Sequence, residues 1–192
     1  DGLAKVFEAE GPKYFNDNPW AIRNKYIDVI LDRNYITIRK FQKENFKPDL
    51  TEEQKVKGME LLEIQRQAML MYTSCGWFFS EISGIETVQI MKYAARAMQL
   101  VARFTNEDFE THFKDILSQA KSNIAEFGTG KDIYERFVKP SVVTAKQLAC
   151  LWAISSLYQD FEDEEDVYCY TVKRHSYQKV QKGSSNFLVG HI

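Results

Sequence analysis

Apolar side chains recur at the three- to four-residue spacing of amphipathic helices over most of the chain, which predicts a mainly α-helical fold. The clearest run starts at Ile85 and is expected to end near Phe104. Its apolar positions are Ile85, Val88, Met91, Ala94, Ala95, Met98, Val101 and Ala102. A second long helix is predicted from Thr51 to about Tyr72. Its apolar stripe is formed by Val56, Met59, Leu62 and Met69. These two segments are the longest predicted elements.

Residues that favour helix ends mark several boundaries. Thr51 with Gln54 three residues later forms a capping box, and Asn18-Pro19 is a second start signal, for a helix that continues toward Phe41. Thr105 is predicted to open a helix after the Ile85 segment. Gly128-Thr129-Gly130 is a turn, and Pro140 separates two further short helices. The predicted fold is therefore a bundle of about six to seven helices.

The last part of the chain changes character. Residues 160–166 contain six carboxylates, which favours a solvated linker rather than a calcium loop, because the Asp-x-Asp-x-Asp-Gly pattern is absent. Residues 167–173 then alternate as a strand does, and Gly183-Ser184-Ser185 predicts a turn to a partner strand at residues 187–192. We therefore expect a helical domain over residues 1–160, and an acidic linker with the start of a truncated β-hairpin over 161–192.

Composition excludes several classes of protein. With 44% hydrophobic and 27% charged residues and a net charge of −2, the chain is typical of a folded domain and offers no general basis for binding nucleic acid. Its longest apolar stretch, Leu148–Leu157, is too short to span a membrane. Three widely spaced cysteines give no disulfide framework and favour a reducing, cytoplasmic compartment. The chain starts at Asp1 rather than methionine, which favours a piece of a longer protein.

The most unusual segment is the connection between the two long helices. Trp77, Phe78 and Phe79 follow one another there, with Glu81 and Glu86 nearby. Aromatic rings stack on the C–H faces of sugars and carboxylates accept hydrogen bonds from hydroxyl groups, so these five residues are candidates for binding a saccharide. The alternative is that the three rings are buried and fill the helix junction.

Other chemistries have weaker support. Cys75 as a nucleophile would need a nearby histidine, His112 or His175, and the surrounding residues lack the pattern of papain-like enzymes. The histidines and cysteines have no metal-ligand spacing, and no phosphate-binding glycine loop is present, so no metal and no cofactor is expected. Glu60, Glu63 and Arg66 are expected to form ion pairs that fix helix register, as is Glu86 with Lys92 or Arg96.

A long stretch of the sequence resembles a known family. Residues 61–89, which include the run Tyr72-Thr73-Ser74-Cys75-Gly76-Trp77-Phe78-Phe79, are similar to the domain of unknown function 3536. Asn18-Pro19-Trp20, Tyr93-Ala94-Ala95-Arg96 and Ser122-Asn123 add to the resemblance, which covers most of residues 15–160. That domain follows the catalytic barrel in a branch of glycoside hydrolase family 57, with α-amylase- or α-mannosidase-like members.

The resemblance implies a function for the parent protein rather than a catalytic site here. Family 57 enzymes act on α-glucans through a glutamate nucleophile and an aspartate acid on a barrel, and nothing in this sequence resembles that barrel. The resemblance therefore implies a non-catalytic helical region that packs on the barrel and shapes the saccharide cleft, with Trp77 as the stacking platform. A purely structural or protein-interaction module of unknown function is the alternative.

Overall fold

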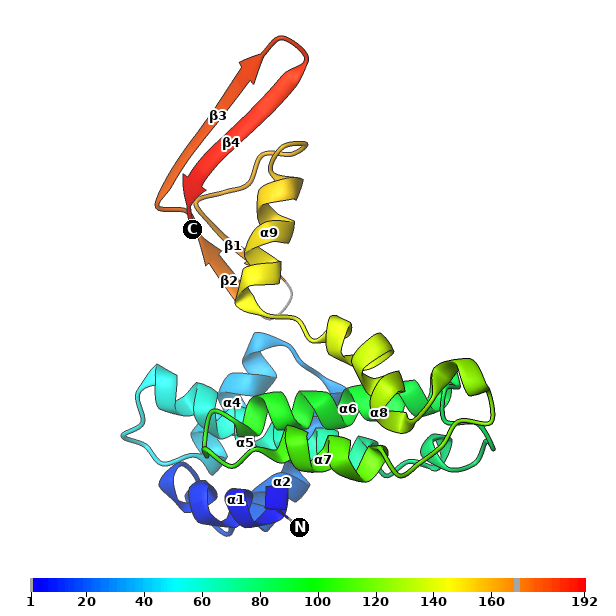
Figure 1. The fold of residues 1–192 in the computed structure, drawn as a ribbon. Helices are drawn as coiled ribbons and strands as arrows, with labels where there is room; N and C mark the ends of the chain where they lie inside the picture. Colours follow the sequence, from blue (N-terminus) through cyan, green and yellow to red (C-terminus); the bar gives the residue numbers. More distant parts are fainter. Residues whose placement is uncertain (1, 168–169) are drawn as a thin grey trace. The chain divides into compact units, whose positions relative to one another are not determined.

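The computed structural model describes residues 2–167 and 170–192, and internal contacts divide the chain into two compact units, residues 1–142 and 143–192. Figure 1 traces the elements in chain order. The first unit holds α1 (Gly2–Glu10), α2 (Pro19–Lys25), α3 (Ile27–Leu31), α4 (Tyr35–Asn45), α5 (Glu52–Leu70), α6 (Ile85–Val101), α7 (Phe109–Leu117) and α8 (Gly130–Ile133). The second holds α9 (Ala145–Ser155), β1 (Glu164–Val167), β2 (Tyr170–Lys173), β3 (Ser176–Lys182) and β4 (Ser185–His191).

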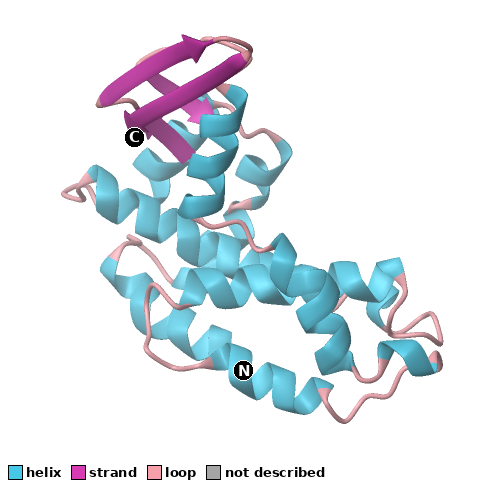
Figure 2. Cartoon of the chain, turned by 45° about the horizontal axis from the view of Figure 1, so that its top comes forward, coloured by secondary structure: helices cyan, strands magenta, loops and turns pink. Residues whose placement is uncertain are grey.

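The predicted fold class is confirmed: the described chain is mainly helical and ends in short antiparallel hairpins, as the colouring of Figure 2 makes plain. The unit boundary at residues 142–143 groups α9 with the hairpins, whereas the sequence suggested a division at residue 160. Among the described helices, none combines the length and the apolar character that crossing a bilayer requires.

The helices α5 and α6 lie side by side and form the centre of the first unit (Figure 1). The capping box that starts α5 is present: the Thr51 hydroxyl accepts from the Gln54 amide at 3.2 Å, and the Gln54 side chain accepts from the Thr51 amide at 2.9 Å. Leu61, Leu62 and Ile64 of α5 are buried in the core. Local capping and a buried apolar face thus define this helix together.

Two clusters of buried side chains make up the core of the first unit, and α6 contributes to both. Leu100 and Val101, near the end of α6, pack in the cluster that contains Phe7, Ile22 and Leu61. Val88, Met91 and Ala95, nearer its start, pack in a second cluster. The second cluster also contains Ile133, Tyr134 and Val138. Because one helix serves both clusters, α6 holds the two halves of the unit together.

Ion pairs on α5 fix the neighbouring helices. The Glu63 carboxylate accepts from the Tyr26 hydroxyl at 2.6 Å, from Arg33 at 2.8 Å and from Arg66 at 3.3 Å. Burial acts to raise the pKa of Glu63, but these donors outweigh it and the net shift is downward. The predicted Glu63–Arg66 pair is confirmed. Glu60 pairs instead with Arg103, beyond the end of α6.

Several helix boundaries differ from prediction. The segment expected to run from Pro19 toward Phe41 is divided into α2, α3 and α4. Asn34 caps α4 by accepting from the Thr37 amide at 2.8 Å, and its own side chain donates to Asp32 at 2.6 Å. Short polar side chains stabilise such breaks by competing for backbone groups. Likewise α6 ends at Val101 rather than near Phe104, and Asp108, not Thr105, caps α7.

The strands of the second unit pair differently from the prediction. Strand β2 pairs with β1, three of whose four residues lie within the acidic run. An ion pair of 3.2 Å joins Glu164 to Lys173 across the register. The segment near the C-terminus forms β4 and pairs with β3 through the turn at Gly183, whose φ is +63°. The acidic run is thus partly strand. Tyr168 and Cys169 of the predicted strand lie outside the described residues.

Candidate functional site

The connection between α5 and α6, residues 72–84, carries the three consecutive aromatic residues, and we call it the aromatic turn. Trp77 is 73% exposed, Phe78 70% and Phe79 50%. The interpretation in which these rings are buried to fill the helix junction is therefore wrong. A group of large exposed aromatic side chains on one short turn is uncommon on a folded domain and points to an interaction surface.

Local backbone structure directs these side chains outward. A 3-10 turn over Ser74–Gly76 is followed by amide hydrogen bonds from Trp77 and Phe78 to the Ser74 carbonyl, at 3.1 and 2.8 Å. Gly76 sits close to α6: a Cβ atom there would lie 3.3 Å from the Ile90 side chain. The rings of Phe78 and Phe79 contact each other edge to face, with centroids 5.1 Å apart. The aromatic turn therefore packs against α6, while its three aromatic rings face solvent.

Glu81 fastens the aromatic turn to a loop that is distant in sequence. Its Oε1 accepts from the Ser83 amide at 2.8 Å and from the Ser122 hydroxyl at 2.6 Å, and its Oε2 accepts from the Asn123 amide at 2.8 Å. The Asn123 side chain in turn donates to the Ser80 carbonyl at 2.5 Å. Both carboxylate oxygens are thus used by the protein itself, which favours a positioning role for Glu81.

The donors around Glu81 also affect its titration. The hydrogen bond from Ser122, followed by those from Ser83 and Asn123, lowers the pKa of Glu81 to about 2. The carboxylate therefore stays ionised, and can accept all these bonds, throughout the range in which the protein is expected to work. Ser122 lies 41 residues after Glu81 in the sequence, so spacing along the chain could not identify Ser122 and Asn123 as partners of this carboxylate.

Glu81→Gln is expected to loosen the aromatic turn at neutral pH, because an amide cannot accept from three donors as a carboxylate does. The folded-state pKa is depressed, so the carboxylate's contribution is complete above the ordinary pKa of 4.5 and fades as the pH falls toward about 2. Amide hydrogen exchange at Ser83 and Asn123 should be faster in the variant, and the difference should shrink as the pH drops below 4.5. A difference that does not depend on pH would contradict the role of the charge.

Glu86, the second predicted acid, occupies the first turn of α6. Its carboxylate turns back toward the start of the helix: a Cβ atom added to Gly84 would lie 3.2 Å from Glu86 Oε2. A negative charge at this end of a helix is stabilised by the unpaired amides there. The predicted partner Arg96 donates instead to Gln99, at 2.5 Å. Glu86 is half-buried and lies next to the aromatic turn.

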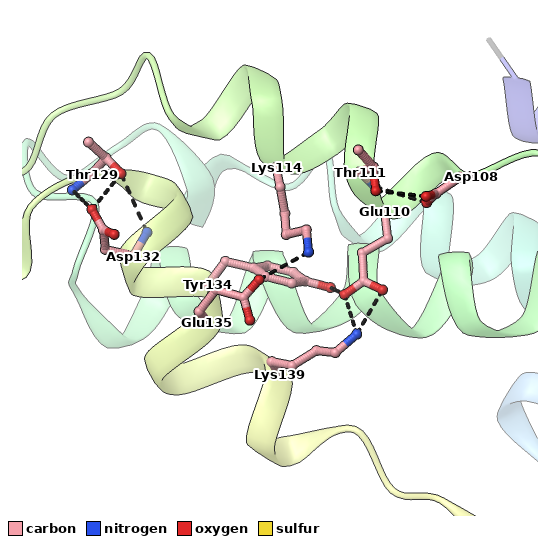
Figure 3. Close-up of polar contacts among 9 residues, drawn as sticks. All are labelled: Asp108, Glu110, Thr111, Lys114, Thr129, Asp132, Tyr134, Glu135 and Lys139. Atoms are coloured by element: carbon pink, nitrogen blue, oxygen red, sulfur yellow. Dashed lines mark hydrogen bonds and ion pairs between the residues drawn. The ribbon is translucent and has the colours of Figure 1, made fainter.

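A second cluster of charged side chains links α7 to the helical segment after it (Figure 3). The Glu110 carboxylate accepts from the Tyr134 hydroxyl at 3.1 Å and from Lys139 at 2.5 and 2.7 Å. Lys114 of α7 donates to Glu135 at 3.0 Å. Tyr134 and Glu135 belong to a π-helical turn, Tyr134–Val138. The members of this cluster come from separate helices, so their spacing along the sequence gives no sign of it.

The cluster stabilises structure rather than offering an acid or a base. Burial and the adjacent Glu110 raise the pKa of Tyr134, so its phenol remains a hydrogen-bond donor. Burial acts to raise the pKa of Glu110, but Lys139, Tyr134 and Lys114 together outweigh it, so the net shift is downward and the group stays ionised. The neighbouring contacts in Figure 3 are helix caps, Asp108 to Thr111 and Thr129 to Asp132. Every group in this network already has a protein partner.

Nucleophile and metal chemistry gain no geometric support. Cys75 is exposed on the aromatic turn, and among the described residues no histidine forms a hydrogen bond with its thiol. His112 lies on α7, while His175 and His191 have ring centroids 5.1 Å apart in the second unit. The described part of the chain brings no three metal-ligating side chains together. The aromatic turn is therefore the strongest candidate site.

Comparison with known proteins gives a family but no annotated relative. The family model described as "Domain of unknown function (DUF3536)" matches residues 1–192. Neither the curated proteins nor the solved structures gave a match.

Proposed function

The chain belongs to the DUF3536 family, and from this premise we propose that it is the non-catalytic helical region of a cytoplasmic glycoside hydrolase resembling family 57. In this proposal it packs on a catalytic barrel of the same protein and completes the binding cleft for an oligo- or polysaccharide. Trp77, Phe78 and Phe79 form the stacking surface, Glu86 accepts hydrogen bonds from sugar hydroxyls, and Glu81 positions the turn. No cofactor and no metal takes part.

One observation carries the proposal: the Trp77 indole is 73% exposed on a turn whose backbone is held in place. Stacking on a sugar requires a flat apolar face that is accessible before the ligand arrives, and it loses least entropy when that face is already fixed. The hydrogen bonds that the Glu81 carboxylate accepts from Ser122 and Asn123 supply this fixation. A flexible or buried indole would not support the proposal.

The test uses a variant in which Trp77 is the only tryptophan, with phenylalanine at Trp20 and Trp152. Trp77 fluorescence should be strongly quenched by iodide, and maltoheptaose, an α-glucan, should protect it. Variants that retain only Trp20 or only Trp152 serve as controls. Trp152 is buried and should be quenched little. If neither maltoheptaose nor cellohexaose reduces the iodide quenching of Trp77, in this chain and in the full-length protein, a saccharide at this turn is excluded.

A second candidate is a protein-interaction module, favoured by the apolar neighbours of the turn. Met69 and Tyr72 at the end of α5 and Ile85 at the start of α6 are also exposed, so the apolar surface extends beyond the three rings. Exposed apolar surface of this kind is typical of contacts between proteins. If the turn is buried against another domain rather than a sugar, Trp77 should be protected from iodide in the full-length protein even without saccharide.

A further inference from the structure

The hairpin of β3 and β4 has one covered face and one exposed face. On the covered face the Tyr177 ring meets the Trp152 ring of α9 edge-on at 6.0 Å, and the Tyr177 hydroxyl donates to the Ser156 carbonyl at 3.1 Å. Side chains alternate along a strand, so the residues of β3 that alternate with Tyr177 lie on the exposed face. There Val180 lies opposite Phe187, with Val189 next along β4, and all three are exposed.

The edges of this hairpin are also unused. Within the described residues, β3 pairs only with β4, so the outward backbone groups of β3 have no neighbouring strand. A two-stranded hairpin is only marginally stable by itself, and an unpaired edge is a template for another strand. The hairpin thus has both an apolar surface and a free set of backbone donors and acceptors.

Charge indicates which strand would fit. Residues 170–192 contain four lysines and arginines and no aspartate or glutamate. Two of the four are paired, Lys173 with Glu164 and Arg174 with Asp163. The other two lie on β3, and no described carboxylate pairs with either. Lys179 donates to the Ser156 carbonyl at 3.4 Å on the covered face, whereas Lys182 is exposed on the opposite face. Strand β4 has no lysine or arginine, so the positive charge is concentrated along β3.

We propose that β3 binds an extended acidic segment of a partner protein, which adds to its outer edge as a third strand. Main-chain hydrogen bonds supply affinity, and the side chains supply specificity. An apolar residue of the partner packs beside Val180 on the exposed face. A carboxylate two positions away pairs with Lys182 on that same face.

A second copy of this chain fits the edge poorly. Pairing β3 with β3 would bring Lys179 and Lys182 next to the same lysines of the other copy, and like charges on neighbouring strands are destabilising. Lysines on edge strands commonly prevent self-association in this way. On the exposed face Lys182 attracts a segment that carries carboxylates, so the charges disfavour the homodimer and favour the acidic partner.

The experiment measures binding of a labelled, end-capped peptide, Thr-Glu-Val-Thr-Glu-Val-Thr, to the full chain by fluorescence anisotropy. Binding is expected, and it should weaken as salt is added because the charge pairs are exposed. Lys182→Glu should weaken it by about tenfold or more. The matched control is Lys146→Glu, which makes the same charge change at an exposed position of α9 and should leave binding unchanged.

Changes in the peptide separate strand addition from simple charge attraction without altering the protein. A peptide with lysine in place of glutamate should not bind, and one that is N-methylated at consecutive central residues should lose binding because it lacks the backbone donors. The proposal is overturned if the acidic peptide does not bind, if the lysine peptide binds equally well, or if N-methylation has no effect. A dimer of the free chain in sedimentation that Val189→Lys dissociates would also overturn it, since a second copy would then be the occupant.

Discussion

Replacing Leu61 by alanine is expected to lower the free energy of unfolding by about 3 kcal/mol. Leu61 is fully buried in the cluster that joins α5 to the N-terminal helices. The truncation removes buried methyl groups and leaves a cavity. The surrounding rings, among them Phe7 and Phe41, belong to a closely packed set and can only partly close it.

Urea unfolding followed by far-UV circular dichroism measures this change, and α5 itself provides the control. Val56 lies on the same helix and was predicted to be in its apolar stripe, but it is 52% exposed. Val56→Ala should therefore change the free energy of unfolding by about 0.5 kcal/mol or less. Similar losses for the two variants would mean that the buried face of α5 has been assigned incorrectly.

If the aromatic turn binds a saccharide as proposed, replacing Trp77 by alanine is expected to weaken binding of maltoheptaose by about tenfold or more, equivalent to about 1.4 kcal/mol, while the fold is retained. The indole is largely exposed and contributes little to the core, so its removal should act on the ligand rather than on stability. Affinity is lost because the apolar C–H face of the sugar would no longer have an aromatic ring on which to stack. Isothermal titration calorimetry on the full-length protein measures the affinity.

Two variants make this test specific. Trp77→Phe keeps a ring and should lose less affinity than Trp77→Ala. Tyr158→Ala removes an aromatic side chain of comparable exposure outside the aromatic turn and should leave affinity unchanged. Equal affinity of the wild type and Trp77→Ala, with both folded by circular dichroism, would remove Trp77 from the saccharide site.

The candidate site shows how far residue pattern alone can reach. An aromatic run placed between two strongly periodic helices predicted that the rings would lie on a connection, and the exposure of Trp77, Phe78 and Phe79 agrees with it. The pattern could not assign a role to Glu81. Its carboxylate is held by Ser122 and Asn123, and the meeting of segments 41 residues apart depends on how the helices pack.

Helix boundaries followed local chemistry wherever a cap was present. Thr51 and Gln54 marked the start of α5 correctly, because a capping box is formed by residues within one turn. The breaks at Tyr26 and at residues 32–34 were missed because apolar periodicity continued through them. At the second break, Asp32 and Asn34 form local hydrogen bonds that end α3 and cap α4.

The sequence by itself determined the helical class, the long helices α5 and α6, and the position of the aromatic turn, since these depend on periodicity and on contacts within a few residues. Only the tertiary structure decided the partners: Glu60 with Arg103, Glu110 with Lys139, and β4 with β3 rather than with residues 167–173. Pairing between distant segments depends on which surfaces packing brings together. Side-chain spacing along one chain does not contain that information.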